Sequence, residues 1–250
     1  MGLPGAGKTT LCEGVKDLMG DKVAYFNADQ VREQFDDWDF SLKGRERQAE
    51  RMRMLADLAI ADGQHAICDF ICPTVQLRQI FEPDVLIFVD TIAKGEYEDT
   101  NSIFEAPECY TVHVTTQNRD YWKYAVENAI QPYVWNNKAP TAQMLGRWQP
   151  WHDGHQALFE QAIEKTGQVQ IMVRDVQGTD DKNPFDFYDV EERVSKRLRP
   201  VFGGRFRIIK VPNITNIVYG RDVGYKIEEI DLPDHIKEIS ATKIRKQMGI

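Results

Sequence analysis

Hydrophobic and polar positions alternate along this chain between short apolar runs and longer segments with a helical period. The apolar runs predict strands at 22–26, 65–71, 85–89, 111–115, 142–145, 169–173, 207–211 and 217–219. Helical periods cover 10–19, 45–62, 118–130, 153–164 and 189–198, and a last helix is predicted after Ser240. In the second of these helices, Met52, Leu55, Leu58 and Ala59 form the apolar stripe. Strands that alternate with helices indicate an α/β fold with parallel sheets.

A short polar and aromatic segment, 132–140, interrupts this alternation and has no period of its own. It predicts a linker at about 135–139 and therefore two domains, 1–135 and 140–250. Both domains are expected to contain a parallel sheet. The brevity of the linker favours two domains that pack together.

Composition and charge narrow the class of protein. The 250 residues are 42% hydrophobic and 28% charged, with a formal net charge of −8, as in ordinary globular proteins. An acidic chain lacks the clustered Lys and Arg that nucleic-acid binding requires, and no apolar stretch is long enough to span a membrane. We therefore expect a cytoplasmic protein that acts on small molecules. Its four cysteines have no zinc or CxxC spacing and are expected to stay reduced.

The first residues carry the strongest chemical signal. Gly2-Leu3-Pro4-Gly5-Ala6-Gly7-Lys8-Thr9 has the spacing of a P-loop, and Thr10 opens the following helix. Backbone N–H groups at Gly2, Gly5 and Gly7 would surround phosphate oxygens, Lys8 would reach the β and γ phosphates, and Thr9 would ligate Mg²⁺. A Gly-rich turn without function would not explain the Lys-Thr pair. A buried strand normally precedes such a loop and none stands before Gly2, so either this strand is absent from the sheet or the sequence begins after it.

Two further groups lie where predicted strands end, at the edge at which α/β proteins bind ligands. The strand at 22–26 leads into Asn27-Ala28-Asp29-Gln30-Val31-Arg32. Phosphoryl transfer needs a carboxylate near the attacking hydroxyl and cations around the transferred group, which Asp29 and Arg32 could supply. Asp69 ends its own strand and is a candidate for a magnesium or substrate contact, although a turn-capping role explains it equally well.

The second half carries its own motif, Gly146-Arg147-Trp148-Gln149-Pro150-Trp151-His152-Asp153-Gly154-His155, between a strand and a helix. His152 and His155 are expected on one face of the first helical turn, where free backbone N–H groups attract anions. Near the C-terminus, Ser240 is placed to cap a helix that carries Lys243 and Arg245. Solvated histidines and a plain capped surface helix are the alternative explanations. The presence of both motifs favours a polyphosphate site.

The first half resembles adenylylsulfate kinase from the P-loop to about residue 116. The resemblance implies MgATP as cofactor, a catalytic role for Lys8 and Asp29, and acceptor contacts from Arg32 and Phe70. Two features depart from the family pattern: Val75 stands where the family has an arginine after Phe70-Ile71-Cys72-Pro73, and the lid at 92–101 is short and acidic. ATP binding is therefore expected more firmly than adenylylsulfate as the acceptor.

The second half resembles the HxGH nucleotidyltransferases, which are Rossmann-like domains. Their first signature matches Gly146, Trp148, His152 and His155, and their second matches Ile239-Ser240-Ala241-Thr242-Lys243-Ile244-Arg245. The resemblance implies a nucleotide site made by Gly146, Trp148, His152, His155, Ser240, Thr242 and Arg245, with His152, His155 and Arg245 catalytic. The segments at 183–185, 192–193 and 220–222 further resemble archaeal nicotinamide-mononucleotide adenylyltransferases.

We therefore expect a bifunctional enzyme in which a P-loop kinase fold precedes a Rossmann-like nucleotidyltransferase fold. The kinase half would phosphorylate a hydroxyl, and the transferase half would move an adenylyl or cytidylyl group from ATP or CTP to a phosphate monoester. Two alternatives stay open: a kinase half that only binds nucleotide and regulates, and a sulfate-activating pair of adenylylsulfate kinase and ATP sulfurylase. A homo-oligomer is compatible with the sequence.

Overall fold

The computed structural model describes residues 1–218, 220–221, 224 and 226–249. The chain divides into two compact units, Met1–Pro132 and Tyr133–Ile250. The predicted linker at 135–139 falls inside the second unit. There the amide of the fully buried Gln168 binds the backbone of Asn136, accepting from its N–H at 3.2 Å and donating to its carbonyl at 2.8 Å. These bonds hold the segment against the parallel sheet of the second unit.

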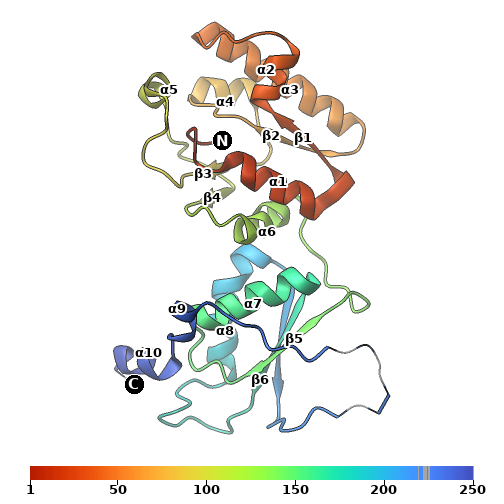
Figure 1. Cartoon of the computed structure of the whole chain (residues 1–250), viewed down its shortest axis with the longest axis vertical. Coiled ribbons are helices and arrows are strands. Elements are labelled where there is room, and N and C mark those ends of the chain that lie inside the picture. The colour runs from red at the N-terminus through yellow and green to blue at the C-terminus, as the bar shows by residue number, and fades with distance from the viewer. Residues whose placement is uncertain (219, 222–223, 225, 250) are drawn as a thin grey trace. The chain divides into compact units, whose positions relative to one another are not determined.

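The first unit contains two parallel two-stranded sheets (Figure 1). One joins β1 (Val23–Asn27) to β2 (His65–Asp69), and the other joins β3 (Ile87–Val89) to β4 (Val112–Val114). Helices α1 (Lys8–Met19) and α6 (Arg119–Ile130) pack together over one face, where Leu11, Val15 and Val126 meet Val89 and Val114 in the core. The remaining helices are α2 (Ala28–Gln34), α3 (Leu42–Ala61), α4 (Val75–Phe81) and α5 (Glu98–Ile103).

Helix α3 buries part of the predicted apolar stripe. Met52 and Ala59 are buried as predicted, but Leu58 is 59% exposed, and Ala49 and Ala56 complete the buried face. Small alanines let α3 approach β2 closely, and a leucine at the margin of that contact faces solvent. The helix also begins at Leu42, earlier than predicted, because the Ser41 hydroxyl accepts the Gly44 N–H at 3.3 Å and caps it.

The second unit is built on one parallel sheet in the order β5 (Ala142–Gly146), β6 (Val169–Arg174), β7 (Phe206–Val211). Helix α7 (Asp153–Thr166) connects the first two strands, and α8 (Phe187–Phe202) connects the last two. Their inner faces meet where Phe159 and Phe202 stack edge to face at 4.9 Å. Helices α9 (Asp234–Lys237) and α10 (Ala241–Met248) follow near the C-terminus.

The prediction of a strand at 217–219 was wrong. The structure has no strand at Ile217 and Val218, which are 65% and 87% exposed, and Tyr219 lies outside the described residues. An apolar run forms a strand only where a sheet edge and a core accept it, and these two side chains meet neither. The related turn at 220–222 is described only at Gly220 and Arg221.

Other elements differ from prediction at their ends. Helix α8 is longer than 189–198 because Asp186 and Asp189 form a capping box at its start. The strand predicted at 65–71 ends at Asp69, before Cys72 takes a positive φ of 45°. Within the described part of the chain, no helix is long and apolar enough to cross a bilayer.

Candidate active sites

The P-loop opens directly onto α1. Gly7 has a φ of 90°, a left-handed conformation that favours glycine, and the helix begins at the next residue, Lys8. The loop therefore aims the free N–H groups of the first helical turn at one point, which suits a phosphate. The Lys8 ammonium donates to the Leu3 carbonyl within the same loop at 3.0 Å.

Asp69 collects three side chains at the end of β2. The Thr9 hydroxyl donates to its Oδ2 at 2.6 Å, the Tyr25 hydroxyl at 3.1 Å and the Asn27 amide at 3.1 Å. The carboxylate is 4% exposed, and β1 and β2 pair so that Asn27 stands opposite Asp69. Register and P-loop thus bring together a hydroxyl and a carboxylate, oxygen ligands of the kind that Mg²⁺ prefers.

Charge at this site is concentrated on Lys8. Burial lowers the pKa of its ammonium, while the nearby carboxylates of Asp69 and Asp29 act in the opposite direction. Asp29 stands in the first turn of α2, where its N–H is held by the Asn27 side chain at 3.0 Å. Lys8, Thr9, Asp29 and Asp69 therefore lie near one another at the carboxyl edge of the β1–β2 sheet, and their roles toward ATP stay predictions.

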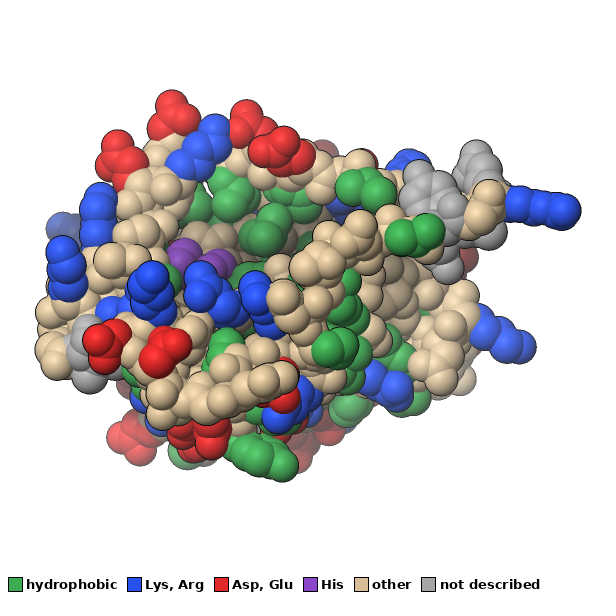
Figure 2. Space-filling view, turned by 90° about the horizontal axis from the view of Figure 1, so that it is seen from below, with side chains coloured by type: hydrophobic (Ala, Val, Ile, Leu, Met, Phe, Trp, Pro, Cys, Tyr) green, Lys and Arg blue, Asp and Glu red, His purple; other side chains and the backbone are tan. Residues whose placement is uncertain are grey.

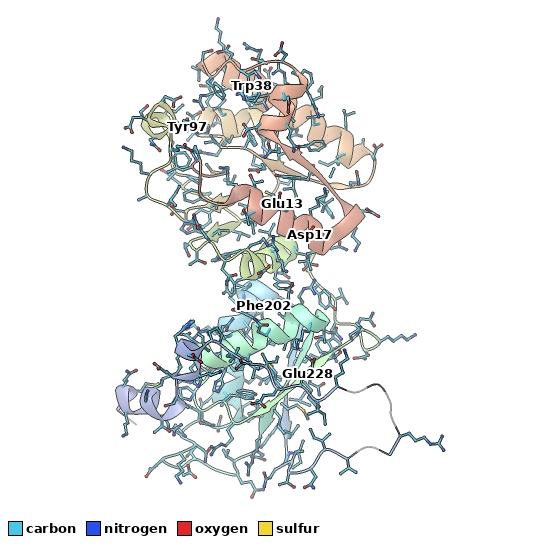
Figure 3. All side chains as sticks on the ribbon, viewed as in Figure 1. Glu13, Asp17, Trp38, Tyr97, Phe202 and Glu228 are labelled. Carbon is cyan, nitrogen blue, oxygen red and sulfur yellow. The ribbon has the colours of Figure 1, made fainter. Side chains whose placement is uncertain are left out.

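An arginine and aromatic cluster lies beyond this point, between α2 and α3. The Arg32 guanidinium is 4.7 Å from the Phe40 ring centre and donates to the carbonyls of Asp37 and Asp39. Arg45 lies over the other side of the cluster, 5.9 Å from the same ring, and donates to the Phe40 carbonyl. Trp38, labelled in Figure 3, is 51% exposed beside them.

Arg32 thus shapes the 37–40 loop as well as offering positive charge. Phe70, the second predicted acceptor contact, packs edge to face on Phe81 at 5.0 Å and leans against the cluster of Ala49, Cys72 and Leu77. Its contacts in the structure are those of a packing residue. Its role toward an acceptor stays a prediction.

A hollow of about 250 Å³ adjoins the P-loop on the α6 side. Gly5, Gly7 and Thr10 line it on one side, and Thr116, Gln117 and Trp122 line it on the other. The Trp122 indole donates to the Thr116 hydroxyl at 2.9 Å, which fixes the ring. A fixed indole and a neighbouring amide suit a nucleotide base. This pocket was not predicted from the sequence, because Trp122 has the pattern of any aromatic residue in a helix.

In the second unit, two side chains of the loop between β5 and α7 anchor it to neighbouring backbone. Trp148 is buried and its indole donates to the Met172 carbonyl at 3.1 Å. The Gln149 amide binds the Phe185 backbone at both ends, donating to its carbonyl at 2.6 Å and accepting from its N–H at 3.0 Å. Trp148, predicted as a nucleotide contact, therefore holds the loop on the sheet.

This anchored loop places two histidines in contact. The rings of His152 and His155 stack with centres 3.6 Å apart. Nδ1 of His152 accepts the Gly154 N–H at 3.1 Å, so a neutral His152 carries its proton on Nε2 and can donate it. A Cβ at Gly154 would stand 3.0 Å from the His152 ring, which explains a glycine at this position. Nδ1 of His155 is buried without a hydrogen-bond partner.

Both imidazoles are disposed to be neutral. Burial lowers the pKa of His155 to about 3, helped by the neighbouring His152, and burial also lowers the pKa of His152. The fixed positive charge near the loop therefore comes from arginine. Figure 2 shows histidine side chains recessed in a hollow, with Lys and Arg side chains beside them.

The C-terminal helix meets this loop. The Arg245 guanidinium donates to the Gln149 carbonyl at 2.5 Å and to the Thr242 hydroxyl at 3.2 Å. Ser240 caps α10 by accepting the Lys243 N–H at 3.2 Å. Arg245 is far in sequence from Gly146, His152 and His155, and its bond to the Gln149 carbonyl brings it to the loop that joins them. The structure adds Arg147, which donates to the Asn183 side chain at 3.2 Å and ties the neighbouring loop to it.

The first unit has the fold class and the phosphate loop of a P-loop kinase. Comparison with known proteins shows similarity to the same class. The model of the family "Adenylylsulphate kinase" matches residues 1–114. A "Probable adenylyl-sulfate kinase" from Aeropyrum pernix is 30% identical over 106 residues, which cover 39% of this chain and 58% of that protein. The N-terminal 114 residues are an adenylylsulfate kinase-like P-loop domain.

A solved structure is similar as well. The Mycobacterium tuberculosis APS kinase, solved in complex with AMPPNP and APS, is 19% identical, with a TM-score of 0.48 over 52% of this chain and 94% of that chain. The chain spans little more than half the length of its curated relative, and the family match ends at residue 114. For the second unit, the function is therefore argued from its own geometry.

Proposed function

We propose that the first unit is a kinase that transfers the γ phosphate of MgATP to a hydroxyl of a small anionic acceptor. The observation that carries this proposal is the contact of 2.6 Å between the Thr9 hydroxyl and Asp69, beside Lys8 at the P-loop. The family match to adenylylsulphate kinase supports it independently. Adenylylsulfate is the first acceptor to test, because the Aeropyrum relative is named for it.

The residues divide the chemistry between them. P-loop N–H groups and Lys8 hold the phosphates, and Thr9 with Asp69 would hold the metal ion. Mg²⁺, when bound, neutralises charge on the β and γ phosphates. Asp29 is placed to orient the attacking hydroxyl, and the hollow beside Trp122 suits the base of ATP. The cluster of Arg32, Phe40 and Arg45 offers cations and an aromatic face to the acceptor.

The test is ADP formation from ATP, Mg²⁺ and a panel of hydroxyl-bearing anions, with adenylylsulfate among them. Lys8→Ala should reduce the rate by about a hundredfold or more, because charge stabilisation at the transferred group is lost. Lys16→Ala, on the exposed face of the same helix, should leave the rate unchanged. Tight ATP binding without ADP from any acceptor would instead identify a regulatory module.

We propose further that the second unit transfers a nucleotidyl group to a phosphate monoester and releases pyrophosphate. The specific observation in its favour is that Arg245 reaches the histidine loop at the Gln149 carbonyl. The acceptor phosphate is already ionised, so this reaction needs alignment and charge stabilisation more than a base. His152 would donate from Nε2 and Arg245 would supply fixed positive charge.

Pyrophosphate release from ATP or CTP, with nicotinamide mononucleotide and other phosphate monoesters as acceptors, tests this second reaction. His155→Ala and Arg245→Ala should each lower the rate about tenfold to a thousandfold, with Lys246→Ala as the matched control on the same helix. Pyrophosphate formation that persists in both variants would contradict the proposal. Formation with sulfate alone as acceptor would favour the sulfate-activating alternative.

A further inference from the structure

Arg45, which faces the Phe40 ring together with Arg32, already binds a carboxylate of the same chain. Its side chain is 9% exposed, and its Nη2 donates to Asp99 Oδ2 at 3.0 Å. The same nitrogen donates to the Thr100 hydroxyl at 3.3 Å, and Nε donates to the Phe40 carbonyl at 2.9 Å. Helix α5, which carries Asp99, therefore engages one of the cations that the cluster offers to an acceptor.

The two partners of this ion pair differ in their surroundings. Arg45 is buried, and a buried guanidinium without an anion is unfavourable because water cannot solvate it. Burial lowers the pKa of the neighbouring Arg32; Asp37 opposes that shift, whereas the positive charge of Arg45 adds to it. The Asp99 side chain is 67% exposed, so it can exchange its bond to Arg45 for water. Arg45 thus requires an anion, but the anion need not be Asp99.

The segment before α5 runs along the phosphate loop. The Thr91 hydroxyl donates to the Ala6 carbonyl at 2.6 Å. Further along, a Cβ at Gly95 would stand 2.9 Å from Cδ of Pro4, so the two backbones are in close contact. Residues 91–99 therefore connect the phosphate loop with the cluster that would bind the acceptor.

We propose that the Asp99 carboxylate occupies the place of an acceptor oxyanion, and that Asp99 thereby sets the charge selectivity of the acceptor site. An acceptor with a sulfate, phosphate or carboxylate group would displace Asp99 and accept the bond from Arg45 Nη2. A neutral acceptor has no group to compensate the guanidinium and would leave the ion pair closed. This inference rests on the proposed kinase function, because it assigns Arg45 to the acceptor.

An ion pair without function is the competing explanation. Exposed ion pairs contribute little to stability, and the pair of Lys94 and Glu98 is of this kind, since its side chains are 69% and 77% exposed. The pair of Arg45 and Asp99 differs because its guanidinium is buried and is fixed by two further bonds. Glu98, which precedes Asp99 and carries the same charge, therefore offers a matched control.

The experiment compares Asp99→Asn with Glu98→Gln in the full chain, using adenylylsulfate as the probe. Asp99→Asn removes the competing charge and keeps the shape of the side chain, so the Kd for adenylylsulfate, measured by titration calorimetry, should fall about threefold to tenfold. In ADP formation, the KM for adenylylsulfate should fall by the same factor, and the KM for ATP should not change. Glu98→Gln should leave all three values as in the wild type.

A double-mutant cycle separates competition at Arg45 from a general loss of negative charge. In an Arg45→Ala background, Asp99→Asn should no longer tighten the binding of adenylylsulfate, because the cation for which the two anions compete is gone. Adenylylsulfate binding that Arg45→Ala leaves unchanged belongs to another site and is subtracted from the comparison.

Two kinds of result would overturn the inference. One is a Kd for adenylylsulfate that is the same, or undetectable, in the wild type and in Asp99→Asn. The other is an equal gain in affinity from Glu98→Gln, or from Asp99→Asn in the Arg45→Ala background. The kinase proposal is decided separately, by whether ADP forms in a Lys8-dependent reaction. Turnover with an unchanged Kd in Asp99→Asn refutes the role of Asp99 alone, whereas tighter binding without ADP from any acceptor supports the oxyanion site and refutes the kinase.

Discussion

At the scale of single residues, the two sites differ in the charges that surround their buried groups. Around the P-loop, burial lowers the pKa of Lys8, and the nearby carboxylates of Asp69 and Asp29 oppose that shift. Around the HxGH loop, burial pushes His152 and His155 toward the neutral form. Neutral imidazoles can donate one hydrogen bond each without repelling Arg245. An incoming polyphosphate would then favour their protonation, since a nearby anion raises the pKa of an imidazole.

The buried His155 predicts a dependence of stability on pH. Its folded pKa is about 3, whereas an unfolded imidazole titrates near 6.5. The unfolded state therefore binds a proton first as the pH falls, so stability is full above about pH 6.5 and is lost toward pH 3. We expect His155→Asn to show a shallower fall in melting temperature between pH 7 and 5 than the wild type.

The matched control for this prediction is His235→Asn, a substitution at an exposed position of α9 in the same unit. It should leave the slope of melting temperature against pH as in the wild type. Comparing slopes separates the titration from any uniform loss of stability that Asn causes at the His155 position. Equal slopes for all three proteins would contradict the account of His155.

At residue scale, Asp69 also gives a direct prediction. Asp69→Asn keeps the shape of the side chain but removes its charge, and an amide is a poorer magnesium ligand than a carboxylate. ADP formation should fall about tenfold to a hundredfold and should recover in part at higher Mg²⁺. Tyr25→Phe, which removes only one donor to Asp69, should change the rate much less. An unchanged magnesium dependence in Asp69→Asn would assign Asp69 to structure alone.

At the scale of elements, the second site depends on a short helix that is held in place by its cap. Helix α10 has eight residues, none of them fully buried, so we expect the Ser240 cap and the Arg245 contacts to supply much of its stability. Helices this short are marginal on their own. The Arg245 bond to Gln149 therefore positions the helix as well as its charge.

Ser240→Ala should destabilise α10 by about 1 kcal/mol, the usual effect of removing an N-cap. Amide exchange in residues 242–246 should quicken about fivefold, which is the same free energy expressed as a ratio. Pyrophosphate formation should fall as well, whereas Ser240→Asp, an equally good cap, should restore the exchange rates. If Ser240→Asp restores exchange but not the rate, the hydroxyl contacts the nucleotide; if neither variant changes exchange, Ser240 does not hold the helix.

At the scale of the whole molecule, the chain carries two units, each with its own parallel strands and its own core. Phe159 is fully buried in the second unit, between the α7 and α8 faces. Its truncation to alanine should cost about 3–5 kcal/mol, and we expect that loss in the second unit alone. Calorimetry should then show one lowered transition, with Lys8-dependent ADP formation retained at 25 °C. Met52→Ala, in the α3 core, should produce the reverse result.

The sequence predicted most of what is local. Strand and helix identity followed from short-range pattern, and the P-loop followed from spacing, because a few glycines, a lysine and a threonine suffice to form it. The sequence also placed Asp29 and the two histidines at strand ends. It missed Ala49 and Ala56 on the buried face of α3, included the exposed Leu58, and added a strand at 217–219, because burial depends on partners that no local pattern contains.

Only the tertiary structure brought distant residues together. The contact of Thr9 with Asp69 depends on how α1 packs against β2, and the approach of Arg245 to Gln149 depends on where α10 packs. The arrangement of four strands of the first unit as two separate pairs could not be read from the chain either, since it reflects which strand edges find a neighbour. Local sequence determined the chemical groups, and the long-range contacts of the folded chain decided which of them meet.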